Sequence, residues 1–250
     1  MFLYLKSGKK LIQIETLQNE ENEEKRYYSA VTYIIVNNEE TAAYCGFMNG
    51  FVIKYEITSS ENSDSKDKWT PSYKVKAHSD EVKWINYNKT LCVIATCGYD
   101  GYVNIYKECD LKLIRSVYIT GFNLDKVILV SSPLPSFIVY DLYNKNVRVF
   151  GLNTIKPIKE IDLQDIIVCY KIVKDFSFNE FIVYGNDKGE IVVKQLPFFE
   201  EIKREKVFKD NEFVHWIDLN ENIKIVYAIG DNGDLAVLCS ADFLYKMKNG

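Results

Sequence analysis

The stretch TCGYDGYVNIY, from Thr96 to Tyr106, has a two-residue turn at Asp100-Gly101 between two short apolar runs. Asp followed by Gly is typical of the tight turn of a β-hairpin, because these residues tolerate positive φ. The stretch therefore predicts two antiparallel strands. The fold depends on whether this hairpin stands alone or recurs along the chain.

Similar turns occur at four further places, each between two apolar runs. The second residues of all five turns are Gly50, Gly101, Lys145, Gly189 and Gly233, which are separated by 51, 44, 44 and 44 positions. Lys145 and Lys188 are the irregular turn residues. Each unit also has an upstream apolar strand, such as EVKWINY at 81–87, and most end in a more polar strand, such as KLIRSVYI at 112–119. Four short strands in about 44 residues are the signature of a β-propeller blade. The chain is therefore predicted to be an all-β propeller.

The repeat predicts one propeller domain over residues 1–250, with five recognisable four-stranded blades and a partial one. Their approximate bounds are 1–17 (partial), 28–76, 77–120, 121–163, 164–208 and 209–250. A polar insertion at 58–70 accounts for the longer first interval. Because MFLYLKSGKKLIQI at the start aligns with the third and fourth strands of a blade, we expect an N-terminally truncated, incomplete propeller. An unclosed propeller would expose apolar blade faces and favour association with a partner.

The composition argues against several classes of protein. The formal net charge is −4, from 31 basic and 35 acidic residues, and without a long basic run no nucleic-acid partner is expected. The six cysteines form no CxxC pair, which fits reduced thiols in a cytoplasmic protein. No apolar stretch approaches the roughly 20 residues needed to cross a bilayer.

The segment AHSDEVKWINYNKTLCVIATCGYDGYVNIY, residues 77–106, resembles a WD repeat. Its His precedes the first strand, its Thr lies in the second strand, and its Asp-Gly forms the turn. The resemblance implies a hydrogen-bonded network of four residues: His78, Thr96, Asp100 and Tyr106. Tyr106 stands where the family usually has Trp, and the other blades lack the complete set.

Within WD-repeat proteins, the run of blades is most similar to the C-terminal propeller of BEACH-domain proteins of the neurobeachin type. The similarity rests on SGKKLIQI near the start, on the insertion after GFVIKYEI, and on SSPLPSFIVYDLYNKNVRVFGLNTIKPIKEI, which leads to EFIVYGNDKGEIVVKQLPFFEEI. It implies a scaffold in vesicle trafficking or membrane dynamics, with this propeller as a protein-binding module. The implied location is the cytoplasm at the periphery of endomembranes, with membrane association only through a larger protein or complex.

His78 and Asp100 could be taken for a general-base pair, but the repeat favours a structural hydrogen bond between a loop and a turn. No nucleophile-elbow serine and no phosphate-binding loop is present. His215 and Cys169 are too few to form a metal site. We therefore expect no catalytic residues, no metal and no cofactor.

The three tryptophans are the candidate partner-binding residues. Trp69, in the insertion, either anchors a partner or covers its own blade, and Trp84 and Trp216 either pack between blades or contact a partner at a propeller face. The acidic run Glu20–Glu24 is a solvated loop or an attractor of basic peptides. The leading function is a non-catalytic platform for proteins or peptides. A subunit of another large assembly, or a propeller enzyme or small-ligand binder, remains as an alternative, and the oligomeric state is open.

Overall fold

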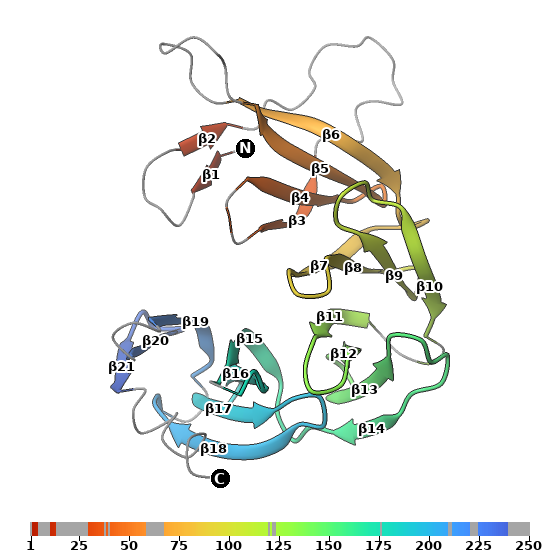
Figure 1. Ribbon diagram of the computed structural model, residues 1–250. Helices are drawn as coiled ribbons and strands as arrows, with labels where there is room; N and C mark the ends of the chain where they lie inside the picture. The colour runs from red at the N-terminus through yellow and green to blue at the C-terminus, as the bar shows by residue number, and fades with distance from the viewer. Residues whose placement is uncertain are drawn as a thin grey trace. The chain divides into compact units, whose positions relative to one another are not determined.

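A computed structural model describes residues 2–4, 11–13, 30–37, 39, 41–58, 68–119, 121, 124–175, 177–209, 212–220 and 225–239. The described residues form β-strands joined by turns and loops, without a helix (Figure 1). Consequently, this part of the chain contains no helix long and apolar enough to cross a membrane.

The strands form antiparallel sheets whose order follows the chain. The first two full sheets are β3 (Val31–Val36), β4 (Ala42–Phe47), β5 (Phe51–Thr58) and β6 (Lys68–Lys76), then β7 (Val82–Asn88), β8 (Val93–Gly98), β9 (Tyr102–Lys107) and β10 (Leu113–Tyr118). The next two are β11 (Leu124–Val130), β12 (Ser136–Asp141), β13 (Asn146–Gly151) and β14 (Lys159–Asp162), then β15 (Ile167–Lys174), β16 (Glu180–Asn186), β17 (Glu190–Gln195) and β18 (Glu200–Lys206). The last described sheet is β19 (Val214–Asn220), β20 (Ile225–Gly230) and β21 (Leu235–Cys239).

The five predicted turns are confirmed by their backbone conformation. The second turn residue has positive φ in every case, and the values are 78° at Gly50, 79° at Gly101, 50° at Lys145, 70° at Gly189 and 82° at Gly233. Lys145 adopts a conformation that is uncommon for a residue with a Cβ. The turn geometry therefore repeats even where the glycine is replaced.

The ends and the insertion are described in part. Phe2–Tyr4 (β1) pairs with Leu11–Gln13 (β2) in an antiparallel ribbon, as the predicted partial blade requires. Most of the insertion, residues 59–67, and the acidic run Glu20–Glu24 lie outside the described residues, as does any fourth strand of the last blade beyond Cys239. Trp69 was predicted in a loop, but it lies in β6 opposite Ile57.

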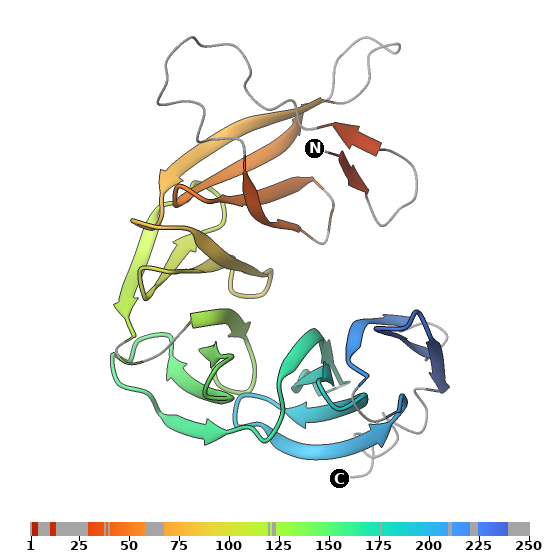
Figure 2. The same cartoon turned by 180° about the vertical axis from the view of Figure 1, so that it is seen from behind.

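The chain divides into two compact units, Met1–Leu129 and Val130–Gly250, which are described separately. The predicted single domain and its blade bounds stay a prediction. Within the first unit, the sheet that begins with β7 packs on the sheet that begins with β3. Within the second, the β19 sheet packs on the β15 sheet, and Figures 1 and 2 both show β19, β20 and β21 side by side.

Burial follows the position of a strand within its sheet. All residues of the second strands β4, β8, β12 and β16 are buried, whereas the fourth strands β10, β14 and β18 are largely exposed or half-buried. A strand with both faces covered is mostly apolar, which explains the apolar runs before each turn. Buried polar residues within these strands, such as Thr96 and Glu180, are hydrogen-bonded. β20 is the exception, because buried residues alternate with half-buried and exposed ones.

The core lies between neighbouring sheets. In the first unit, Tyr44 and Val52 of one sheet join Val82, Ile85 and Ile94 of the next in one apolar cluster. In the second unit, side chains of β15, β16 and β17 form a cluster with those of β19 and β20. At both of these junctions, the first strand of the following sheet makes the contact with the preceding sheet.

Two glycines allow this first strand to approach closely. A Cβ on Gly185 would lie 2.4 Å from the Cβ of Val214, and a Cβ on Gly46 would lie 2.7 Å from Cγ1 of Val82. Both glycines lie four residues before the second residue of their turn. The same repeat position thus receives the first valine of the following sheet.

The approach at Gly185 predicts a specific cost of adding one methyl group. We expect Gly185→Ala to lower the free energy of unfolding by about 1–3 kcal/mol, because the new Cβ overlaps Val214. Ile229→Ala, at the equivalent position of the next sheet, should change the free energy of unfolding by about 0.5 kcal/mol or less, because Ile229 is partly exposed. Denaturant titration of the full chain measures both values, and equal losses would contradict the role assigned to Gly185.

Candidate functional site

Three of the four predicted network residues are brought together at the Asp100-Gly101 turn. His78 lies in the loop before β7, and its Nδ1 is 2.9 Å from Oδ1 of Asp100. The Nε2 atom of His78 is 2.8 Å from Oγ1 of Thr96. A neutral imidazole that donates from Nδ1 to the carboxylate and accepts at Nε2 from the hydroxyl satisfies both contacts.

Burial and hydrogen bonding set the charge of this network. Burial lowers the pKa of His78 and outweighs the attraction of Asp100, which keeps the imidazole neutral. Burial would raise the pKa of Asp100, but His78 and the backbone N–H groups of Ser79 and Tyr102 lower it below its usual value. The carboxylate therefore holds the loop and the turn together.

Tyr106 does not join these contacts among the described residues. Its side chain is buried in the apolar cluster with Ile85 and Ile94, and burial raises its pKa to about 12. Asn104, opposite Thr96 in the sheet, instead donates from Nδ2 to the carbonyl oxygen of Ala77 over 2.6 Å. Asn104 thus ties β9 to the same loop, a role that the sequence analysis missed.

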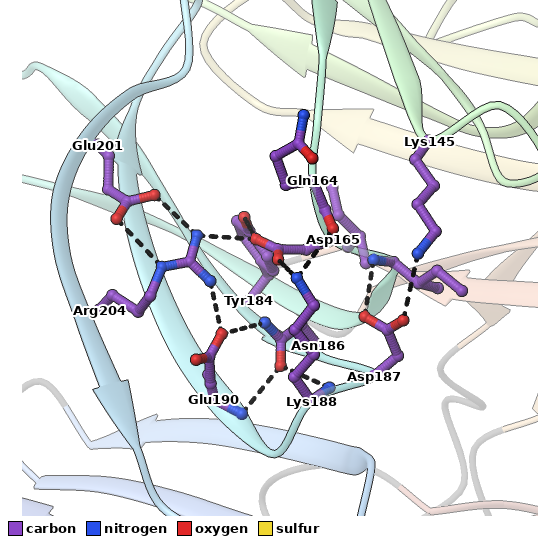
Figure 3. Close-up of polar contacts among 12 residues, drawn as sticks. Lys145, Gln164, Asp165, Tyr184, Asn186, Asp187, Lys188, Glu190, Glu201 and Arg204 are labelled. Carbon is purple, nitrogen blue, oxygen red and sulfur yellow. Dashed lines mark hydrogen bonds and ion pairs between the residues drawn. The ribbon is translucent and has the colours of Figure 1, made fainter. Parts of the chain in front are cut away.

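A second polar network surrounds the turn of the β15–β18 sheet (Figure 3). Asp165, 1% exposed, accepts hydrogen bonds from Nζ of Lys188 at 3.0 Å, Nη2 of Arg204 at 2.8 Å and the hydroxyl of Tyr184 at 3.1 Å. Burial alone would raise the pKa of Asp165, but the donors Arg204 and Lys188 prevail and lower it to about 2. Asp165 is therefore a carboxylate under all ordinary conditions.

The remaining donors of Arg204 are paired with two glutamates. Its Nη1 lies 2.5 Å from Oε2 of Glu190, and its Nε and Nη2 bind the two oxygens of Glu201 at 3.1 and 2.8 Å (Figure 3). Asn186 donates to Glu190 over 2.7 Å and accepts from the backbone N–H of Lys188 at 3.0 Å. The network thus links the loop before β15, the turn and the fourth strand β18.

The two networks occupy corresponding places with opposite polarity. Asp100 precedes Gly101 as Lys188 precedes Gly189, and His78 and Asp165 both lie in the loop before the first strand of their sheet. In the β7–β10 sheet a loop imidazole meets a turn carboxylate. In the β15–β18 sheet a loop carboxylate meets a turn ammonium group. The irregular Lys188 is explained by this reversal.

Neither network is arranged for acid–base catalysis. A carboxylate with a pKa of about 2, such as Asp165, is a weak base near neutral pH. His78 is buried, and its ring nitrogens already contact Asp100 and Thr96. Within the described residues, no three His, Cys, Asp or Glu side chains gather as metal ligands.

Exposed tyrosines lie beside the His78 network. Tyr99 and Tyr102 flank the turn and are 54% and 41% exposed, and Tyr118, 57% exposed, lies opposite Tyr102 with ring centroids 5.1 Å apart. Lys83 lies over the ring of Tyr99 at 4.2 Å. Tyr99 thus contacts β7, and Tyr102 contacts β10 at the other edge of the sheet. We call Tyr99, Tyr102 and Tyr118, which surround the turn on both sides, the tyrosine surface. The sequence signal was present, since both turn tyrosines lie within TCGYDGYVNIY.

The three tryptophans have different environments. Trp69 is 8% exposed and packs in the apolar cluster of its own sheet. Trp84 is half-buried, with its ring centroid 4.2 Å from that of Tyr33 in the preceding sheet. Trp216, 132 positions after Trp84, is 44% exposed. Of the three, Trp216 offers the largest exposed fraction for a partner.

Comparison with known proteins supports the fold. No protein-family model and no curated protein matches the chain. The chain is similar to the crystal structure of the Cps50 (Swd1) β-propeller domain of Myceliophteria thermophila, with a TM-score of 0.62 and 13% identity over 83% of this chain and 64% of that chain. This chain thus spans slightly less than two thirds of that domain. Together with the repeated sheets, the likeness shows an all-β fold: a β-propeller of the WD-repeat type.

The Asp165 network makes a prediction about stability. We expect Asp165→Asn to lower the free energy of unfolding by about 2–4 kcal/mol, because Arg204 and Lys188 lose a buried carboxylate partner. Glu205→Gln is the matched control, since Glu205 pairs with Lys203 at the surface, and it should cost about 1 kcal/mol or less. Denaturant titration at pH 7 distinguishes the two, and similar values would refute the importance of burial at Asp165.

Proposed function

We propose that this protein is a non-catalytic scaffold that binds other proteins or peptides. The observation that carries the proposal is the tyrosine surface, which combines exposed aromatic rings with a rigid support. Tyrosine provides a large contact area and a hydroxyl at low conformational cost, and it is enriched in protein interfaces. The His78 network fixes the turn that carries Tyr99 and Tyr102, because Asp100 also accepts from the backbone N–H of Tyr102 at 3.1 Å.

The tyrosine surface is tested by binding of cellular proteins to the full chain. We expect Tyr99→Ser combined with Tyr118→Ser to reduce partner capture by about tenfold or more, since aromatic anchors dominate binding energy. Tyr143→Ser is the matched control, because Tyr143 is 78% exposed and lies outside the tyrosine surface. Quantitative affinity purification followed by mass spectrometry measures capture. Equal partner capture by the unaltered chain, the double variant and the Tyr143→Ser control would refute the role of this surface.

We further propose that the scaffold is part of a BEACH-type protein in vesicle trafficking, located in the cytoplasm at the periphery of endomembranes. The support is the sequence resemblance that begins with SGKKLIQI and continues through SSPLPSFIVYDLYNKNVRVFGLNTIKPIKEI. The expected result is that the coding sequence upstream of Met1 encodes a BEACH domain and further blades. Absence of both would refute this assignment and leave the scaffold proposal intact.

A further inference from the structure

Four loops lie at one end of the β11–β14 and β15–β18 sheets, opposite the turns between their second and third strands. Their described residues are 131–135, 152–158, 177–179 and 196–199. The backbone N–H of Leu152 donates to the carbonyl oxygen of Pro135 at 3.3 Å, and that of Leu196 donates to Glu180 at 2.9 Å. The carboxylate of Glu180 accepts from the backbone N–H of Ser131 at 2.8 Å, across the two sheets. The loops therefore form one continuous surface.

Large apolar side chains project from this surface. The most exposed aliphatic residue and the most exposed phenylalanine of the described residues lie here, Ile155 at 81% and Phe178 at 70%. Ile158 and Leu134 are 45% and 38% exposed. We call these four residues the loop-end patch. Exposed apolar groups gathered at one place are typical of interaction sites.

The local structure holds the ring of Phe178 in solvent. Phe178 has a φ of 61°, a conformation that is uncommon for a residue with a Cβ. Asp175 stabilises the turn, because one carboxylate oxygen accepts from the backbone N–H of Ser177 at 2.9 Å and of Asn179 at 2.8 Å. The chain thus maintains a costly backbone conformation that exposes a phenylalanine, and such strain is found at functional sites.

A neighbouring blade does not cover this patch. Where the β19 sheet packs on the β15–β18 sheet, the contact is made by side chains of the strands, such as Val183 and Val214. With this neighbour in place, Phe178 at the end of the β15–β18 sheet is still largely exposed. Because a neighbouring sheet covers strand faces and leaves the loops at their ends open, further blades of the same chain would leave the patch open as well.

Lysines accompany the apolar side chains. Lys156 directly follows Ile155, and Lys159 directly follows Ile158. Both lysines are exposed, and among the described residues neither forms an ion pair, although Lys159 lies 5.3 Å from the ring centroid of Phe198. Apolar side chains beside lysines are typical of surfaces that enter the interface of an anionic bilayer. A bilayer accepts apolar groups from separate loops without the close shape complementarity that a protein interface requires.

Most carboxylates at this end of the two sheets are already paired. Asp175 accepts hydrogen bonds within its own turn, and Glu180 is 1% exposed and lies 2.9 Å from Nζ of Lys174. The carboxylate of Glu200, at the start of β18, is exposed and offsets part of the lysine charge. The opposite end of the same sheets instead carries the charged network around Asp165. The loop end is therefore the end suited to an apolar, anionic surface.

We propose that the loop-end patch inserts into the interface of an anionic phospholipid bilayer. Ile155 and Phe178 enter the boundary of the acyl chains, and Lys156 and Lys159 lie among the headgroups. The contact with the membrane is then direct, whereas the sequence resemblance implies an association through a larger protein or complex. The inference goes beyond the proposed scaffold function and does not use the tyrosine surface, so each can fail without the other.

The first test is sedimentation of the full-length protein with vesicles of phosphatidylcholine and phosphatidylserine, mixed in a ratio of about three to one. We expect Ile155→Ser combined with Phe178→Ser to reduce binding by about tenfold or more, because two apolar side chains are lost from the bilayer. Tyr143→Ser is the matched control, since Tyr143 is 78% exposed at the opposite end of the β11–β14 sheet, and it should bind as the unaltered protein does. No binding of the unaltered protein, or equal binding by the double variant, would overturn the proposal.

The charges supply a second test with effects of opposite sign. Lys156→Gln combined with Lys159→Gln should lower binding to the mixed vesicles by about fivefold or more and leave binding to phosphatidylcholine alone unchanged. Glu200→Gln should strengthen binding to the mixed vesicles, because it removes an exposed negative charge. Reversed effects, or equal binding of the unaltered protein to both kinds of vesicle, would overturn the assignment to an anionic bilayer.

A fluorescent amino acid whose emission depends on polarity identifies the inserted residue. At position 155 its emission should shift to shorter wavelength when the mixed vesicles are added, and at position 143 it should not shift. If the protein sediments with vesicles while position 155 remains in water, the proposal is overturned. Circular dichroism and thermal unfolding verify the folding of each variant. Equal partner capture by the tyrosine variants refutes the tyrosine surface alone, because vesicle binding is measured without other proteins.

Discussion

The architecture depends on the approach of a first strand to the apolar face of the preceding sheet. Val214 approaches Gly185 and Val82 approaches Gly46, each too closely for a Cβ on the glycine. Around these contacts, the second strands become buried on both faces and the fourth strands remain at the surface. The same steric relationship thus occurs at two junctions, one in each compact unit, and in both it accompanies a second strand that is buried along its whole length.

Polar networks add a second level of organisation, because they join the loop before a sheet to the turn within it. His78 with Asp100 and Asp165 with Lys188 have the same task but different chemistry. Both consist of groups already paired within the chain. The residues around Asp100 show the contrast between a buried polar network and the exposed tyrosines beside it.

The turns and strands were predictable from the sequence, because positive φ and alternating apolar residues are local properties. The environments of Trp69 and Trp216 were not, since burial depends on which sheet lies opposite. The Asp165 network also escaped prediction. Its polarity is reversed relative to His78 and Asp100, and Arg204 reaches it from a strand 39 residues further along the chain.

The opposite polarity of the two networks has a genetic consequence. Recombination between these repeats, within the strands that separate loop from turn, would set Asp165 against Asp100 in one product and His78 against Lys188 in the other. The first product brings two carboxylates together and the second leaves the ammonium group without its carboxylate. Each product would therefore lose one attractive pair between the loop and the turn, so exchange of partial segments between these two repeats destabilises both products.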